Sequence, residues 1–168
     1  MRLVALFSFF TFCALAVETV LPRWLPIAAL VPDLVLILAV DLGFRHHGAW
    51  APVMAFAMGY AVDTFSGDHL GLNALMLTLV FVMAYEMSRH LMAGGTLIGV
   101  LAVFLGVMVK QVADFAVSSG GAASGQLGTL LPPVLLQAAI TAVVTPWIFA
   151  MLARCKRTLG LPQRSVRE

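Results

Sequence analysis

The side chains most able to take part in chemistry or binding are ionisable groups that lie within apolar segments. Glu18, Asp33, Asp63, Lys110 and Asp114 each interrupt a hydrophobic run. A charged side chain at the centre of a bilayer costs about 3 kcal/mol even on lenient insertion scales, so each needs a partner or a role. Lys110 and Asp114 are four residues apart and share a helix face. We expect an ion-paired cluster toward the outer face of the membrane, completed by Asp33 or Asp63.

This polar cluster has two interpretations. Its charges can fasten helices to one another or extend to the nearby interface, which is the simpler role. They can also form a site for a partner or a ligand. The sequence leaves both interpretations open.

Catalytic arrangements are poorly supported. Asp33 and Asp63 could form an aspartyl protease dyad but lack suitable flanking sequence. Ser66 lies near acids and His69, but in a segment expected to be a turn. The chain contains no Gly-rich phosphate loop, His-Glu-x-x-His motif or nucleophile elbow. We therefore predict that the protein is not an enzyme and uses no cofactor.

A metal site is equally unsupported. His46 and His47 are adjacent, so on a helix they do not face the same way, and no cysteine or carboxylate has ligand spacing with them. Asp41 lies four residues before Arg45, which favours a local ion pair at the end of a helix. We predict no metal.

The composition indicates a membrane protein. The 168 residues are 61% hydrophobic and 11% charged, with a mean hydropathy of +1.00. A helix needs about 20 apolar residues to cross the bilayer, so the chain has room for about six or seven spans and no soluble domain. A net charge of +2 is too small to suggest nucleic acid as a partner.

Six apolar stretches predict an all-α compact bundle of about six transmembrane helices. Pro32 is expected in the first turn of the second helix, which shortens that span. Whether this span is a full-length helix stays open. The stretches cover Leu3–Leu21, Ala28–Phe44, Ala49–Phe65, Leu70–Met87, Thr96–Val117 and Leu130–Leu152.

Basic residues give the expected orientation. With six spans, nearly all of them fall on one side, and only Arg23 lies on the other. The positive-inside rule then places both termini in the cytoplasm. We predict one transmembrane domain over residues 1–152 and a basic cytoplasmic tail over residues 153–168. The segregated residues are Arg2, Arg45, Arg89, Arg154, Lys156, Arg157, Arg164 and Arg167.

The first stretch resembles a signal peptide that ends in Ala14-Leu15-Ala16. Apolar sequence continues to Leu21, however, and an uncleaved first helix is the favoured interpretation. The two cysteines, Cys13 and Cys155, are not expected to form a disulfide.

Small residues mark two helix faces that should be buried. Ala51, Ala55 and Gly59 recur every four residues and end at Asp63. Such stripes let neighbouring backbones approach closely. The second stripe runs through Gly95, Gly99, Ala102 and Gly106 and continues to Lys110.

A motif between Pro32 and Leu75 resembles a known family. Pro32-Asp33 opens a short apolar span, and Gly59-x-x-x-Asp63 and Gly67-x-x-x-Gly71-Leu72-x-Ala74-Leu75 follow. This order and spacing resemble the bacterial rod shape-determining protein MreD family. The family's residue types match at Pro32, Asp33, Gly59, Asp63 and Gly71, whereas Lys110 and Asp114 match no motif.

The resemblance implies a non-enzymatic, multi-pass component of the bacterial inner membrane. It would act in the rod complex, or elongasome, and support lateral peptidoglycan synthesis and rod cell shape. MreC is the first expected partner, and MreB, RodA, a class B penicillin-binding protein and membrane lipid are the others.

The same resemblance implies an alternative function. MreD-like folds are similar to the substrate-binding subunits of energy-coupling-factor transporters, so the chain could bind a vitamin-like solute. The short outer loops offer few groups for a lidded pocket, which favours the scaffold.

Overall fold

The computed structural model describes residues 2–24, 31–46, 48–66, 71–90, 96–118 and 127–158. All regular structure in these residues is helical, as predicted. Each expected stretch overlaps one of the six helices. They are α1 (Arg2–Trp24), α2 (Leu34–Arg45), α3 (Trp50–Ser66), α4 (Leu72–His90), α5 (Thr96–Ser118) and α6 (Leu127–Thr158).

Among the described residues, three helices are long and apolar enough to cross a membrane. These candidate spans are Leu3–Leu21, Thr96–Val117 and Pro132–Thr158. The helices α2, α3 and α4 fall short of the same criteria of length and hydropathy. The count of six crossings therefore stays a prediction.

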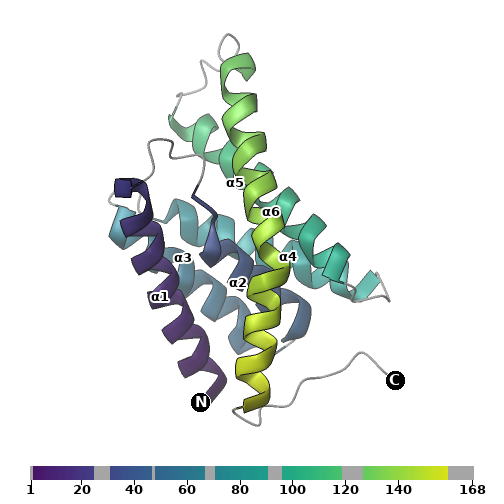
Figure 1. The fold of residues 1–168 in the computed structure, drawn as a ribbon. Coiled ribbons are helices and arrows are strands. Elements are labelled where there is room, and N and C mark those ends of the chain that lie inside the picture. Colours follow the sequence, from purple (N-terminus) through teal and green to yellow (C-terminus); the bar gives the residue numbers. More distant parts are fainter. Residues whose placement is uncertain are drawn as a thin grey trace.

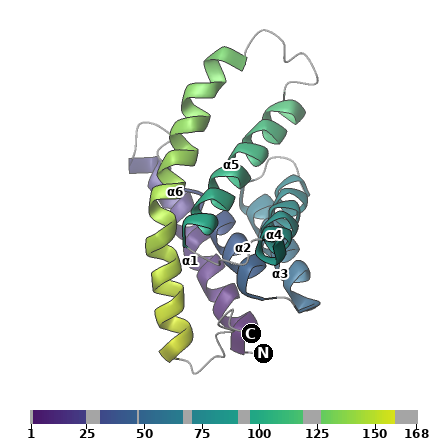
Figure 2. The same cartoon turned by 90° about the vertical axis from the view of Figure 1, so that its right-hand side faces the viewer.

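Helix α2 is the centre of the bundle. It contacts each of the other five helices, which surround it in Figures 1 and 2. Every residue from Val35 to Gly43 is buried. The helix has 12 residues, or about 18 Å at the usual rise, compared with about 30 Å for a hydrocarbon core. The helix alone is therefore too short to span a hydrocarbon core.

The start of α2 corrects the expected position of Pro32. That residue lies before the helix, and Asp33 is the N-cap, its side chain accepting a 2.9 Å hydrogen bond from the Leu36 N–H. Oε1 of Glu18 accepts from the N–H groups of Leu34 at 2.5 Å and Val35 at 3.2 Å. The helix begins where these two carboxylates satisfy its first donors.

Small residues allow close contacts between the helices. A Cβ at Gly59 would lie 2.4 Å from the Cα of Ala74, so α3 and α4 approach at backbone distance. A Cβ at Gly99 would lie 2.5 Å from Cε2 of Phe149, where α5 meets α6. The stripe residues Ala51, Ala55, Asp63, Ala102 and Gly106 are also buried.

Two glycines of the expected packing set differ from this pattern. Gly71 does not pack between helices, because no atom of the described residues, apart from its chain neighbours, lies within 4 Å of the position of a Cβ there. Its φ of +97° instead places it in the left-handed turn before α4, where glycine is favoured. Gly95 lies outside the described residues.

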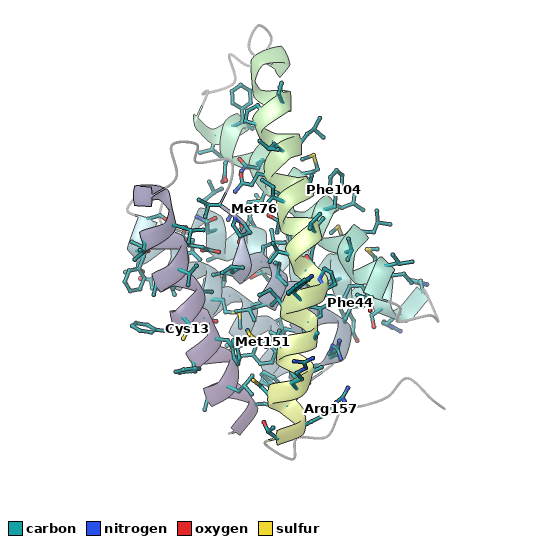
Figure 3. The ribbon with its side chains drawn as sticks, viewed as in Figure 1. Cys13, Phe44, Met76, Phe104, Met151 and Arg157 are labelled. Carbon is teal, nitrogen blue, oxygen red and sulfur yellow. The ribbon has the colours of Figure 1, made fainter. Side chains whose placement is uncertain are left out.

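The outer surface of the bundle is apolar. Phe9 is 65% exposed, Leu97 82% and Trp147 79%. Figure 3 shows carbon-rich side chains projecting from the outer sides of α1, α5 and α6. A surface of this kind suits contact with lipid chains rather than water.

The first residues of α1 and the last residues of α6 lie at the same end of the bundle (Figures 1 and 2). Helix α6 continues past Leu152, the expected end of the transmembrane domain, and ends at Thr158. Lys156 on this extension is buried.

Candidate functional site

Four of the predicted charged residues meet at the N-terminal end of α2. Nζ of Lys110 on α5 lies 2.6 Å from Oδ2 of Asp33, and their side chains are 15% and 10% exposed. Glu18 on α1 caps the same end of α2. Asp114 lies one turn beyond Lys110 on α5. We call Glu18, Asp33, Lys110 and Asp114 the α2 N-terminal cluster.

Electrostatics explains why acids gather at this point. The first N–H groups of a helix carry a partial positive charge and have no partner within the helix. Asp33 and Glu18 supply acceptors to three of these donors in α2. Lys110 then neutralises the second oxygen of Asp33. The cluster thus joins α1, α2 and α5 through one helix end.

A cavity of about 250 Å³ adjoins this cluster. All six helices or their immediate flanks contribute to it. Gln137 on α6 accepts a hydrogen bond from Gln111 on α5 and donates one of 3.3 Å to the carbonyl of Val31. The lining residues are Glu18, Val31, Pro32, Asp33, Val62, Ser66, Asn73, Lys110, Asp114 and Gln137.

Asp63 has a different role from the one expected. Its carboxylate accepts hydrogen bonds from the N–H groups of Gly71 at 2.9 Å, Asn73 at 3.0 Å and Ala74 at 3.1 Å. It therefore caps the N-terminal end of α4 from the last turns of α3. Of the two expected partners for Lys110, the structure selects Asp33.

A second group of charges lies at the C-terminal end of α2. Oδ2 of Asp41 is 2.5 Å from Nζ of Lys156, and Oδ1 is 2.7 Å from Nε of Arg45. Nζ of Lys156 also lies 4.9 Å from the centre of the Phe7 ring. We call Asp41, Arg45 and Lys156 the α2 C-terminal cluster. The predicted pair of Asp41 with Arg45 is confirmed but incomplete.

The burial of Lys156 was not predicted, because this residue was assigned to the tail. The side chain is 3% exposed and follows the buried residues Phe149 and Leu152 along one face of α6. This spacing of seven and four residues continues the buried stripe of the helix. The periodicity was the signal that could have placed Lys156 inside.

His46 packs in an aromatic environment. Its ring centre lies 5.8 Å from that of Phe7 and 5.7 Å from that of Trp50. His47 lies outside the described residues. Within the described ranges, no three histidine, cysteine or acidic side chains are grouped so as to hold a metal ion.

An apolar groove of about 220 Å³ runs between α1 and α3. Small and hydroxyl side chains form part of its lining, although most of the outer surface carries large apolar side chains. The lining residues are Ser8, Thr11, Phe12, Leu15, Met54, Ala57, Met58, Ala61 and Phe65.

A comparison with protein-family models matches most of the chain. The family model described as rod shape-determining protein MreD matches residues 1–155. Neither a curated protein nor a solved structure is significantly similar to the chain.

Proposed function

Because the chain belongs to the MreD family of rod shape-determining proteins, we propose that it is a multi-pass scaffold of the bacterial inner membrane. In this role it supports lateral peptidoglycan synthesis and rod cell shape within the elongation machinery. MreC is its direct partner, and MreB, RodA and a class B penicillin-binding protein belong to the same assembly. The observation that carries the proposal is the family match over residues 1–155.

The proposed topology has six crossings and both termini in the cytoplasm. The ends of α1 and α6 that lie together in Figures 1 and 2 support this topology. So does the position of Arg45 at the end of α2, close to Lys156 of α6, which contacts the same carboxylate. Basic residues near one end of the bundle favour a cytoplasmic location for that end. The residues after α6 form a cytoplasmic tail.

The buried ion pairs suit a scaffold. Lys110 and Lys156 each neutralise a carboxylate of α2, one near its beginning and one in its C-terminal half. Removal of one partner of a buried ion pair strongly destabilises the fold, because the other charge is left buried and unpaired. These contacts therefore hold α5 and α6 in one arrangement around α2. A fixed arrangement keeps the outer faces of the helices in the positions that a partner protein would contact.

The groove between α1 and α3 is the proposed contact for the membrane helix of MreC. Part of its lining consists of small and hydroxyl side chains, which let a second helix approach closely. These residues are Ser8, Thr11, Ala57 and Ala61. In a bilayer, such close packing supplies most of the association energy between helices.

The cavity beside the α2 N-terminal cluster is the observation that favours the transporter alternative. Its volume is about 250 Å³, whereas pockets for drug-sized ligands run from about 300 to 1,000 Å³. A vitamin-sized solute is thus poorly accommodated, and the scaffold is the better supported function.

The test is replacement of the resident MreD in a rod-shaped bacterium. Cells that make this chain should stay rod-shaped and MreC should co-purify with it, whereas depleted cells should become round. Ala57→Trp fills the groove and should reduce recovery of MreC at least fivefold. Val143→Trp, at an exposed position of α6, is the matched control and should leave recovery unchanged. Round cells despite a normal level of the membrane-inserted chain would refute the shape function.

A further inference from the structure

The α2 C-terminal cluster contains more positive than negative charge. The carboxylate of Asp41 is fully buried, and two cations share it, Lys156 at Oδ2 and Arg45 at Oδ1. The side chain of Lys156 is almost completely buried, whereas that of Arg45 is 39% exposed. An anion that approaches this cluster from outside the bundle therefore meets the guanidinium of Arg45, and one positive charge of the cluster has no carboxylate of its own.

The surroundings of the cluster add further positive charge. Arg154 and Arg157 are exposed on the last turns of α6, and Arg157 extends outward from the end of that helix in Figure 3. Glu86 of α4 is the other acidic side chain that the structure describes at this end, and it is paired with Arg89 and His90. The first turn of α5 contains no acidic residue. Acidic groups therefore do not balance the basic ones here.

The guanidinium of Arg45 has donors that are not engaged. Its Nε atom lies 2.7 Å from Oδ1 of Asp41, and neither terminal amino group has an acceptor among the described residues. Its Cζ atom lies 5.9 Å from the centre of the Phe149 ring, so the group lies between α2 and α6. A guanidinium stays charged at any physiological pH and can bind a phosphate through two parallel hydrogen bonds. Arg45 thus offers an interhelical site for one phosphate group.

Exposed apolar side chains lie beside this basic group. A Cβ at Gly99 would lie 2.5 Å from Cε2 of Phe149, so the start of α5 adjoins the ring that Arg45 covers. Leu97 and Leu101, on the first two turns of α5, are exposed. Basic pockets between transmembrane helices bind the headgroups of anionic lipids. The arrangement matches such a lipid, because its phosphate can bind the guanidinium while its acyl chains cover the apolar side chains.

We propose that the guanidinium of Arg45 binds the phosphate of an anionic phospholipid such as phosphatidylglycerol. A zwitterionic lipid also carries a phosphate, but its amine would add a positive charge to an end of the bundle that already has a surplus. A soluble phosphate lacks the acyl chains that the exposed leucines would contact. The site does not depend on the proposed contact with MreC, since Arg45 is not part of the groove between α1 and α3.

The lipid class can be tested with the unaltered chain. Native mass spectrometry of the full protein, released from nanodiscs of equal parts phosphatidylglycerol and phosphatidylcholine, measures which lipid is retained. One basic residue near an anionic lipid contributes about fivefold in affinity. We therefore expect retention of phosphatidylglycerol to exceed that of phosphatidylcholine about fivefold or more. Equal retention of the two lipids would overturn the inference.

A matched pair of variants locates the bound lipid. Arg45→Gln leaves Lys156 beside Asp41 but removes the guanidinium, and should lower retention of phosphatidylglycerol about fivefold. Arg89→Gln makes the same change at a 61% exposed position whose ion pair lies within α4, and should have little effect. If Arg45→Gln does not fold, Arg45→Lys is compared with Arg89→Lys by the same criterion, because lysine keeps the charge but loses the two parallel hydrogen bonds. Equal retention within the pair used would contradict the assignment.

Two further measurements separate this site from other sources of the signal. Salt screens exposed charges more than partly buried ones, so the preference should persist in concentrated ammonium acetate if Arg45 holds the lipid. General attraction to the exposed arginines would disappear under the same conditions. Excess inorganic phosphate should leave the lipid in place, because the acyl chains keep it beside the site. Loss of the preference in salt, or displacement of the lipid by inorganic phosphate, would contradict a phospholipid site at Arg45.

Discussion

Nζ of Lys156 lies 2.5 Å from Oδ2 of Asp41, and the side chains of both residues are almost completely buried. The contact joins residues 115 positions apart and holds the end of α6 against the C-terminal half of α2. Together with the pair between Lys110 and Asp33, it fastens both ends of the short central helix.

Removal of the Lys156 ammonium should destabilise the bundle strongly. Lys156→Met leaves the buried Asp41 carboxylate with Arg45 alone, and we expect a loss of about 3 kcal/mol in the free energy of unfolding, measured by detergent titration. Arg157→Met, at the exposed neighbouring position, should change it by less than about 0.5 kcal/mol. Equal effects of the two variants would show that the pair is not structural.

A double variant distinguishes the effect of an unpaired buried charge on stability from the effect of lost packing. Asp41→Leu combined with Lys156→Met removes both partners and replaces them with apolar groups. Replacement of a buried pair in this way is often neutral or stabilising. We expect the double variant to unfold at a higher detergent fraction than Lys156→Met alone, and a lower value would contradict this reasoning.

Lys110 should couple energetically to Asp33 and not to Asp63. Asp33→Asn keeps an acceptor for the Leu36 N–H but removes the charge that Lys110 contacts. A double-mutant cycle with Lys110→Met should give a coupling of about 1 to 3 kcal/mol. The same cycle with Asp63→Asn should give less than about 0.5 kcal/mol, because the carboxylate of Asp63 binds the start of α4. The reverse ranking would refute the assignment.

Gly59 should tolerate no side chain. The added Cβ of Gly59→Ala would lie 2.4 Å from Cα and 2.7 Å from N of Ala74. These are backbone atoms, so α3 and α4 must separate, at a cost of about 2 kcal/mol. In Gly106→Ala the nearest atom is Cγ1 of Val80 at 3.1 Å, a side-chain atom that can shift. We expect that variant to lose less than about 1 kcal/mol in the same titration, and a larger loss than in Gly59→Ala would contradict the packing.

Hydropathy predicted the six helical segments because runs of apolar residues between polar turns are a strong signal. It did not predict where α2 begins. Residues 31–33 are apolar or compatible with a helix start, yet α2 begins only at Leu34. The carboxylates of Glu18 and Asp33 fix that start, and one of them comes from another helix.

The polar contacts were predicted only where they are local. Asp41 and Arg45 are one turn apart and their pair could be inferred from spacing. The partner choice of Lys110 required knowledge of how α5 lies against α2 and α4, which spacing does not contain. Lys156 was assigned to the tail because basic residues after a span usually lie in water.

The orientation of the bundle underlies the proposed locations of both clusters, and cysteine labelling in intact cells measures it most directly. In a Cys13→Ala, Cys155→Ala background, a membrane-impermeant maleimide should label Val117→Cys near the end of α5. Arg157→Cys near the end of α6 should react only after the membrane is permeabilised. Labelling of Arg157→Cys from outside intact cells, with Val117→Cys protected, would contradict this orientation.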